Sequence, residues 1–225
     1  LAGRAKGAKE PFGWVKKLPW KDVRFLAPFL SMVIFVPAGA GGIVNASFQM
    51  NQVVHNTLWV TGHFHMTLAT TVVLTFFGIS YWLIPLLTNR TFTPLANRLG
   101  IVQSVVWTAG IVLMSGAMHI VGLLGSPRRT SFATYNNHPT ALEWQPYMAV
   151  IGAGGSLLFI GILLYLAIAA YLLLIAPRSE SPGEYPIGRV NEHAQKPPRV
   201  LERWSVWITL TFALILIAYF VPIMN

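Results

Sequence analysis

The chain has 225 residues, of which 54% are hydrophobic and only 10% are charged. Soluble globular domains carry roughly 25% charged residues, so this composition excludes an ordinary soluble protein. The formal net charge is +9, but the Lys and Arg residues lie between long apolar runs instead of forming one basic stripe, which argues against a nucleic-acid-binding protein.

The sequence contains no cysteine. This absence excludes disulfides, thiolate zinc sites, iron–sulfur clusters and thiolate-bound haem from the chain. Any metal must therefore be bound through His, Met or oxygen ligands. Residues 1–24 lack the apolar core of a signal peptide, and we expect them to form a cytoplasmic N-terminal segment.

The predicted elements are transmembrane helices. Asp, Glu, Lys and Arg are absent from four long stretches, at 25–89, 99–127, 144–177 and 204–225. A membrane-spanning helix needs about 20 apolar residues, so the first stretch has room for two spans with a break near 45–51. The sequence predicts an all-α integral membrane protein with five spans, at about 25–44, 51–87, 95–124, 146–175 and 204–221.

The distribution of positive charge gives the expected orientation. Seven Lys and Arg residues precede the first span, two lie between the second and third, and five lie in the Pro-rich link at 176–203. Lys and Arg accumulate on the cytoplasmic side, so these three segments should lie inside, with the N-terminus cytoplasmic and the C-terminus outside. Only Arg128 and Arg129 remain for the outer side, where they invite a partner of opposite charge.

The second span carries the candidate chemistry. Polar groups at membrane depth are costly and usually functional, and this span contains His55, His63 and His65 within eleven residues. On a continuous α-helix His63 and His65 point about 200° apart, so they cannot bind one metal ion and would serve two centres on opposite flanks. His55 would lie about 12 Å from His63 along the helix, within about 80° of the same face.

Haem is the natural ligand for such a pair. It is flat and apolar on its faces, takes an imidazole as axial ligand, and carries anionic propionates that need cations at the wet edge. Arg128 and Arg129, on the same side as His55, are placed to meet those propionates. The alternatives are a hydrogen-bonded core histidine pair and ordinary interfacial arginines. The small residues at 38–42 suit close helix packing or contact with a large planar ligand.

Three segments together resemble the catalytic subunit of haem-copper oxygen reductases, particularly the B-type cytochrome c oxidases. They are PAGAGGIVNASF at 37–48, VHNTLWVTGHFHMT at 54–67 and GLLGSPRR at 122–129. The resemblance runs in order over almost the whole chain and places it as the last five helices of a larger bundle. It implies that His63 is the axial ligand of the high-spin haem, where oxygen binds, and that His65 is an axial ligand of the low-spin haem.

The resemblance also implies the surroundings of these ligands. His55, Asn56, Arg128 and Arg129 would hold the haem propionates. Two haems follow, a high-spin haem of a-type and a low-spin haem of a- or b-type. In A-type members an acidic residue follows the histidine equivalent to His55 and helps to bind a magnesium-class ion. Asn56 stands there in this chain, and a neutral amide weakens such a site.

The rest of the enzyme is expected outside this chain. The family's copper ligands and the second low-spin ligand belong to the upstream part of subunit I. The expected partners are that upstream part, a copper-bearing subunit II, a small accessory membrane subunit, cytochrome c as electron donor, and the lipid bilayer. The implied function is a proton-translocating terminal oxidase of a bacterial or archaeal plasma membrane. The alternatives are a nitric oxide reductase with non-haem iron in place of copper, and a non-catalytic membrane haem electron carrier.

Overall fold

The computed structural model describes residues 13, 15–130, 134–179, 199 and 201–220. Every named element in these ranges is a helix, which confirms the all-α prediction. The chain divides into two units, Leu1–Gly183 and Glu184–Asn225. The second unit contains helix α8 (Trp204–Phe220), which begins where the sequence predicts the last span.

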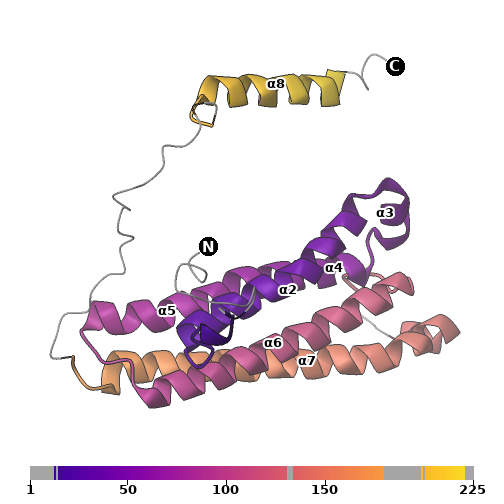
Figure 1. Cartoon of the computed structure of the whole chain (residues 1–225). Coiled ribbons are helices and arrows are strands. Elements are labelled where there is room, and N and C mark those ends of the chain that lie inside the picture. The colour runs from indigo at the N-terminus through magenta and orange to yellow at the C-terminus, as the bar shows by residue number, and fades with distance from the viewer. Residues whose placement is uncertain (1–12, 14, 131–133, 180–198, 200, 221–225) are drawn as a thin grey trace. The chain divides into compact units, whose positions relative to one another are not determined.

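Four long helical runs lie side by side in the first unit (Figure 1). They are α2 (Val23–Ala46), the run 58–88 that ends in α5 (Val73–Thr88), α6 (Pro94–Leu123), and α7 (Pro139–Ala170) with its continuation to Ile175. Helices α6 and α7 pack along their length, and α2 packs against the run 58–88 and α6. All four are long and apolar enough to cross a membrane, whereas the apolar helix Trp204–Ile217 in α8 is shorter.

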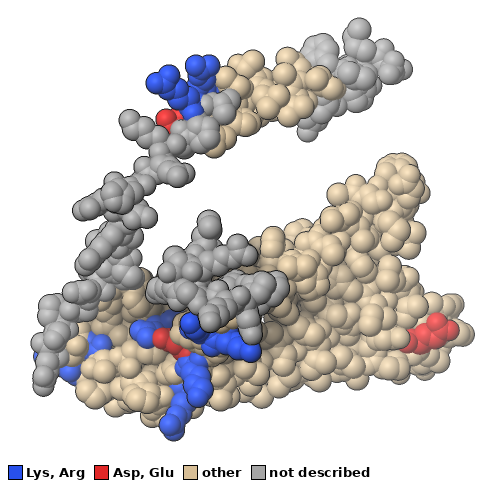
Figure 2. Space-filling view, viewed as in Figure 1, with Lys and Arg blue, Asp and Glu red and all other residues tan. Residues whose placement is uncertain are grey.

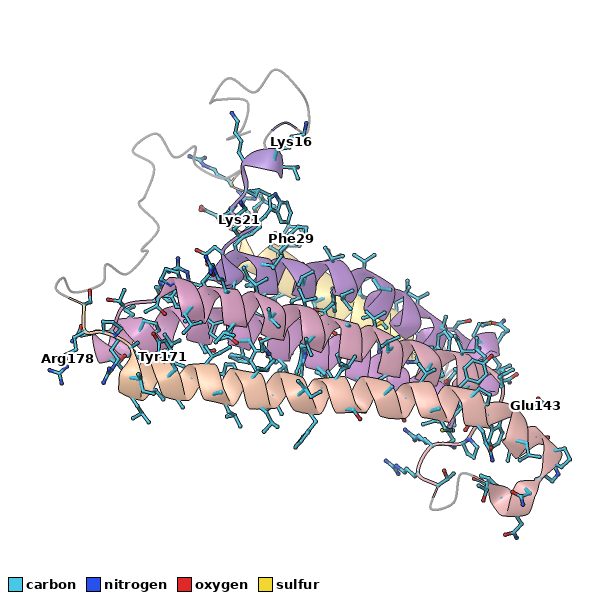
Figure 3. The ribbon with its side chains drawn as sticks, turned by 90° about the horizontal axis from the view of Figure 1, so that it is seen from below. Lys16, Lys21, Phe29, Glu143, Tyr171 and Arg178 are labelled. Atoms are coloured by element: carbon cyan, nitrogen blue, oxygen red, sulfur yellow. The ribbon has the colours of Figure 1, made fainter. Side chains whose placement is uncertain are left out.

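Charged side chains gather at the ends of the bundle and leave an uncharged surface between them (Figure 2). Figure 3 places Lys21, Tyr171 and Arg178 toward one end of the first unit and Glu143 at the other. At the first end, the Thr91 N–H donates to the Pro177 carbonyl over 2.8 Å, which ties two of the predicted inner links together. This arrangement agrees with the predicted grouping of the loops, while the direction across the membrane stays a prediction.

The ends of these helices follow from local chemistry. Asp22 caps α2 by accepting a hydrogen bond from the Arg24 N–H, and Thr93 caps α6 in the same way through the Ala96 N–H. Capping side chains satisfy donors that have no partner inside the helix. Helix α7 begins at Pro139 rather than near 146, because proline fits the first turn of a helix and supplies its fixed φ.

The second predicted span is broken near its N-terminal end, which corrects the expectation of one helix over 51–87. Helix α3 (Phe48–Val54) stops, and α4 (Leu58–Phe64) begins after a turn. The Thr57 hydroxyl donates to the Val54 carbonyl over 2.7 Å and accepts from the Trp59 N–H, so it caps the new helix. His55 therefore lies in the turn after α3 and His63 on α4, so the continuous helix on which the predicted spacing of about 12 Å rested is not formed.

A π-helical segment, η2 (His65–Val72), joins α4 to α5. Wider π turns disturb the regular ladder of backbone hydrogen bonds and are frequent at functional sites. Two carbonyls of this segment accept from neighbouring helices: Trp107 Nε1 of α6 donates to Ala69 over 2.7 Å, and the Ser31 hydroxyl of α2 donates to Thr71 over 3.2 Å. The surrounding helices thus hold the segment that begins at His65.

Candidate functional site

His63 lies against α2. Its Nδ1 is 3.0 Å from the carbonyl oxygen of Ala38. Because a carbonyl oxygen only accepts, Nδ1 carries the hydrogen and Nε2 keeps its lone pair. Gly41 and Gly42 make room for the ring: a methyl group added at Gly42 would lie 3.1 Å from His63 Cε1, and one added at Gly41 would lie 3.2 Å from His63 Nδ1. The small residues on α2 therefore serve the close packing of an imidazole.

His65 has the same tautomer but a different anchor. Its Nδ1 is 2.8 Å from the carbonyl oxygen of Thr61, one turn earlier on its own helix. Phe64 and His65 both keep right-handed helical backbone angles, so the two histidine side chains leave the helix about 200° apart. The half-buried rings are separated along the chain by Phe64, whose side chain is 53% exposed.

Each of these rings can therefore bind a metal through Nε2. A hydrogen bond from the other ring nitrogen to a carbonyl is the arrangement that fixes tautomer and orientation in metal-binding histidines. The described residues contain no group of three or more His, Cys, Asp or Glu side chains that could hold an ion between them. The donor set thus fits single axial ligation of two separate planar iron centres better than a metal site built by this chain alone.

The structure brings the turn at His55 together with the turn that carries Arg128 and Arg129. Asn56 accepts two hydrogen bonds from Arg128, one at its carbonyl from the backbone N–H over 2.9 Å and one at Oδ1 from Nη2 over 3.0 Å. The Leu58 N–H also donates to the Ser126 carbonyl over 2.9 Å. The structure therefore brings Asn56 and Arg128 of the predicted group together, while His55 and Arg129 are their exposed neighbours in the two turns.

A left-handed backbone makes this contact possible. Asn56 has a φ of 62° and Arg129 a φ of 61°. Asparagine tolerates this conformation better than most residues because its short polar side chain bonds locally. The sequence predicted that Asn56 belongs to the site together with His55 and the two arginines. The structure adds that the Asn56 amide oxygen accepts from the Arg128 guanidinium and orients it.

His119 is the residue that the sequence did not place at the site. The structure puts His119 beside His63, with both rings close to Gly41. Its ring meets Trp59 edge to face, with 4.6 Å between centroids. A cavity of about 310 Å³ adjoins the ring and is bounded by residues of α2, α4, η2 and α6. Nothing in the sequence pattern links position 119 to position 63, because their contact depends on how α6 packs on α4.

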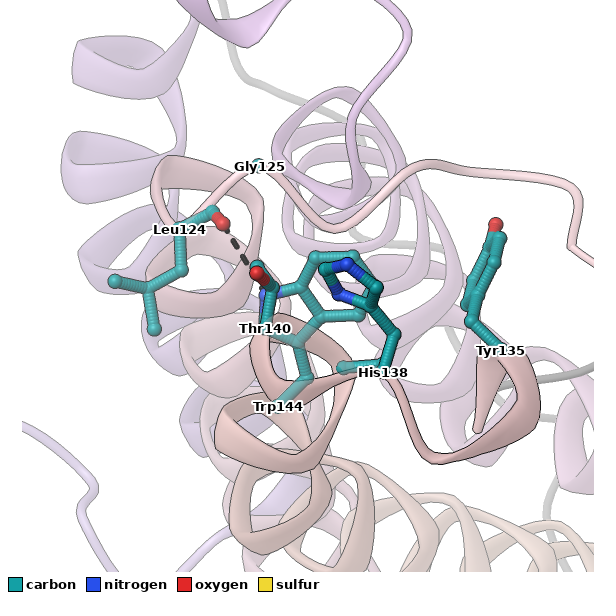
Figure 4. Close-up of a pocket in the computed structure, with 7 residues that line it drawn as sticks. Leu124, Gly125, Tyr135, His138, Thr140 and Trp144 are labelled. Carbon is teal, nitrogen blue, oxygen red and sulfur yellow. Dashed lines mark hydrogen bonds between the residues drawn. The ribbon is translucent and has the colours of Figure 1, made fainter.

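A second cavity, of about 520 Å³, lies at the ends of α6 and α7 (Figure 4). Trp144 Nε1 donates to the Leu124 carbonyl over 3.1 Å, and Tyr135 meets Trp144 edge to face. His138 also lines this cavity. The residues that line it include none of the predicted site residues, so it is separate from the histidine pair.

Comparison with known proteins agrees with these observations. Residues 8–157 match the family model described as Cytochrome C and Quinol oxidase polypeptide I. The chain is 36% identical over 224 residues to a cytochrome c oxidase subunit 1 of Thermus thermophilus, a match covering 97% of the chain and 39% of that protein. It is 45% identical over 108 residues to another Thermus thermophilus cytochrome c oxidase subunit 1, covering 48% of the chain and 100% of that protein.

Two further matches extend the comparison. A quinol oxidase subunit 1 of Sulfolobus acidocaldarius is 28% identical over 161 residues, which is 69% of the chain and 30% of that protein. A solved structure described as a heme-copper terminal oxidase dimer superposes with a TM-score of 0.78 at 30% identity, over 97% of this chain and 39% of that one. The chain thus spans about two fifths of the length of the first of these relatives.

Proposed function

Because the chain belongs to the cytochrome c and quinol oxidase polypeptide I family, we propose that it forms the C-terminal portion of the catalytic subunit of a B-type haem-copper terminal oxidase. The assembled enzyme reduces oxygen to water with electrons from cytochrome c and translocates protons. The single observation that carries this proposal is the His63–Phe64–His65 segment, in which both histidines present a free Nε2 from opposite flanks of one helix.

In this proposal His63 would hold the iron of the high-spin haem and His65 would hold the iron of the low-spin haem. The free Nε2 of each ring supplies the ligand atom, and the carbonyls of Ala38 and Thr61 hold the rings in that tautomer. When bound, the haems supply electron transfer and the iron at which oxygen is reduced. The protein's contribution here is to fix two ligands on one rigid element and so set their separation.

The outer cluster of His55, Asn56, Arg128 and Arg129 would hold the haem propionates. Guanidinium groups form charge-assisted, often bidentate hydrogen bonds with carboxylates, and these are stronger than neutral ones. The bonds from Arg128 to Asn56 orient one guanidinium before any anion arrives. Replacing Arg128 by Met should therefore shift the haem reduction potential, because a nearby positive charge stabilises the electron-rich form.

The remaining parts of the enzyme are assigned to other segments and chains. The copper ligands and the second ligand of the low-spin haem would come from the upstream part of subunit I, and electrons would arrive through a copper-bearing subunit II. A small accessory membrane subunit, cytochrome c and the lipid bilayer complete the proposed partners. We place the complex in a bacterial or archaeal plasma membrane, with the N-terminus of this chain inside.

Optical spectra of the purified oxidase complex test the assignment. The His63→Ala variant should lose the carbon monoxide difference spectrum of the high-spin haem and keep the low-spin bands, and His65→Ala should do the reverse. His138→Ala, which lies at the separate cavity, is the matched control and should leave both signals intact. Carbon monoxide binding that survives His63→Ala, or low-spin bands that survive His65→Ala, would refute the ligand roles.

Turnover measurements on the same complex separate the alternatives. Oxygen consumption with reduced cytochrome c supports the oxidase. Nitric oxide consumption without oxygen consumption would assign the complex to the reductases with non-haem iron. Two haems with neither activity would make it an electron carrier.

A further inference from the structure

His119 lies on α6 and approaches the same part of α2 as His63, although the two residues are far apart in the sequence. A methyl group added at Gly41 would lie 3.2 Å from His119 Nε2 and 3.2 Å from His63 Nδ1. Both rings therefore rest on the same point of α2. Gly62, the residue before His63, is close to the same ring, because a methyl group there would lie 3.0 Å from His119 Nδ1.

A hydrogen bond also joins α6 to α4, and a second one anchors the His119 ring. His119 Nδ1 is 2.7 Å from the carbonyl oxygen of Ser115, so Nδ1 donates and the ring is anchored on α6. The hydroxyl of Ser115 donates to the carbonyl oxygen of Gly62. One residue of α6 thus holds both the His119 ring and the backbone that precedes His63.

The Trp59 ring covers another side of His119, edge to face at 4.6 Å between centroids. The neighbouring cavity of about 310 Å³ shows that space remains on one side of the imidazole. Removing the His119 ring would enlarge this cavity and take away the ring that shares Gly41 with His63. The torsion that turns an imidazole about its Cβ–Cγ bond is soft, so a ring held at one nitrogen still needs contacts on its faces to define its plane.

We propose that His119 is a positioning residue that fixes the ring plane of His63, and through it the iron–imidazole bond of the high-spin haem. This inference rests on the function proposed above, in which His63 ligates that haem. His119 acts by contact across Gly41 and by its anchor on Ser115, and it is not itself a ligand.

Resonance Raman spectroscopy of the reduced oxidase complex tests this role, because the iron–histidine stretching band reports the orientation and strength of that bond. Three variants divide the possible causes. His119→Ala removes the ring, His119→Leu keeps much of the volume without nitrogen, and His119→Gln keeps an amide that can donate toward Ser115. Ile120→Ala, at a side chain that is 48% exposed on the same helix, is the matched control.

We expect the band to shift and broaden in the alanine and leucine variants and to return toward the wild-type position in the glutamine variant. The low-spin haem bands should not change. A wild-type band in His119→Leu overturns the inference even if the alanine variant fails to assemble, and so does an equal shift in Ile120→Ala. By contrast, a wild-type complex without an iron–histidine band, or a band that survives His63→Ala, overturns the proposed function itself.

Discussion

Two glycines of α2, Gly39 and Gly42, give the sharpest prediction. Alanine at Gly42 would place a methyl group 3.1 Å from His63 Cε1, whereas alanine at Gly39 meets nothing within 4 Å. Both positions lie inside the same helix, so both substitutions change helix propensity alike. The pair therefore separates crowding of the imidazole from any effect on α2 itself.

The magnitudes follow from two opposing effects. Glycine inside a helix is less favourable than alanine by about 0.5–1 kcal/mol, so Gly39→Ala should stabilise the fold slightly. Overpacking a well-filled site costs about 1–3 kcal/mol. The net cost of Gly42→Ala is then about 0–2.5 kcal/mol. At the upper end, the population of molecules in which His63 keeps its native position would fall by roughly 60-fold.

The assay combines thermal unfolding of the purified complex with its carbon monoxide difference spectrum. Gly42→Ala should lower both the unfolding temperature and the high-spin signal relative to Gly39→Ala. Gly41→Ala should do the same, because its methyl group would press on both His63 and His119. Equal behaviour of the variants at Gly39 and Gly42 would show that the His63 ring does not need the space left by the glycine at 42. The close packing of His63 on Gly41 and Gly42 would then not be required for the site.

Substitutions at three other positions test contacts that hold the helices and turns of the first unit. Trp107→Phe removes the bond to a carbonyl of the π-helix and should cost about 0.6–1.7 kcal/mol in unfolding experiments, with Trp207→Phe on α8 as control. Asn56→Ala should destabilise the complex more than Asn56→Gly, by about 1 kcal/mol, because glycine accepts the φ of 62° without the strain that the alanine Cβ introduces. The Arg24 side chain, which donates to Asp22, holds the pKa of that carboxyl below its ordinary value of 3.8. The ion pair therefore stabilises the protein at higher pH and is lost as pH falls below that value, and Asp22→Asn should remove this part of the acid dependence in pH-dependent unfolding.

The sequence predicted the parts of the fold that depend on composition and local chemistry. Uncharged stretches located the first span to within two residues at each end and the third to within one. Charge counts grouped the inner links that the Thr91–Pro177 hydrogen bond joins. The pairing of His55 with the arginines was also predicted, and the Asn56–Arg128 bonds place these segments together.

What the sequence missed depends on tertiary contacts. The break at 55–57 requires carbonyl and N–H partners from the turn at 126–128, which no local pattern reveals. The π-helix after His65 likewise relies on Trp107 and Ser31 from other helices. His119 carries no periodic relation to His63, since only the close approach of α6 at Gly62 brings the two rings together.

The two histidines differ in how this chain supports them, and that difference has a consequence for the assembled enzyme. His63 is anchored on α2 and contacted from α6, whereas the described contacts of His65 include an anchor on its own helix at Thr61. An intrahelical anchor survives small movements of neighbouring helices, because donor and acceptor move together. An anchor between two helices does not survive such movements, because donor and acceptor then move apart. Substitutions that shift α2 or α6 should therefore disturb the high-spin signal before the low-spin signal, and equal loss of both would argue against this division of support.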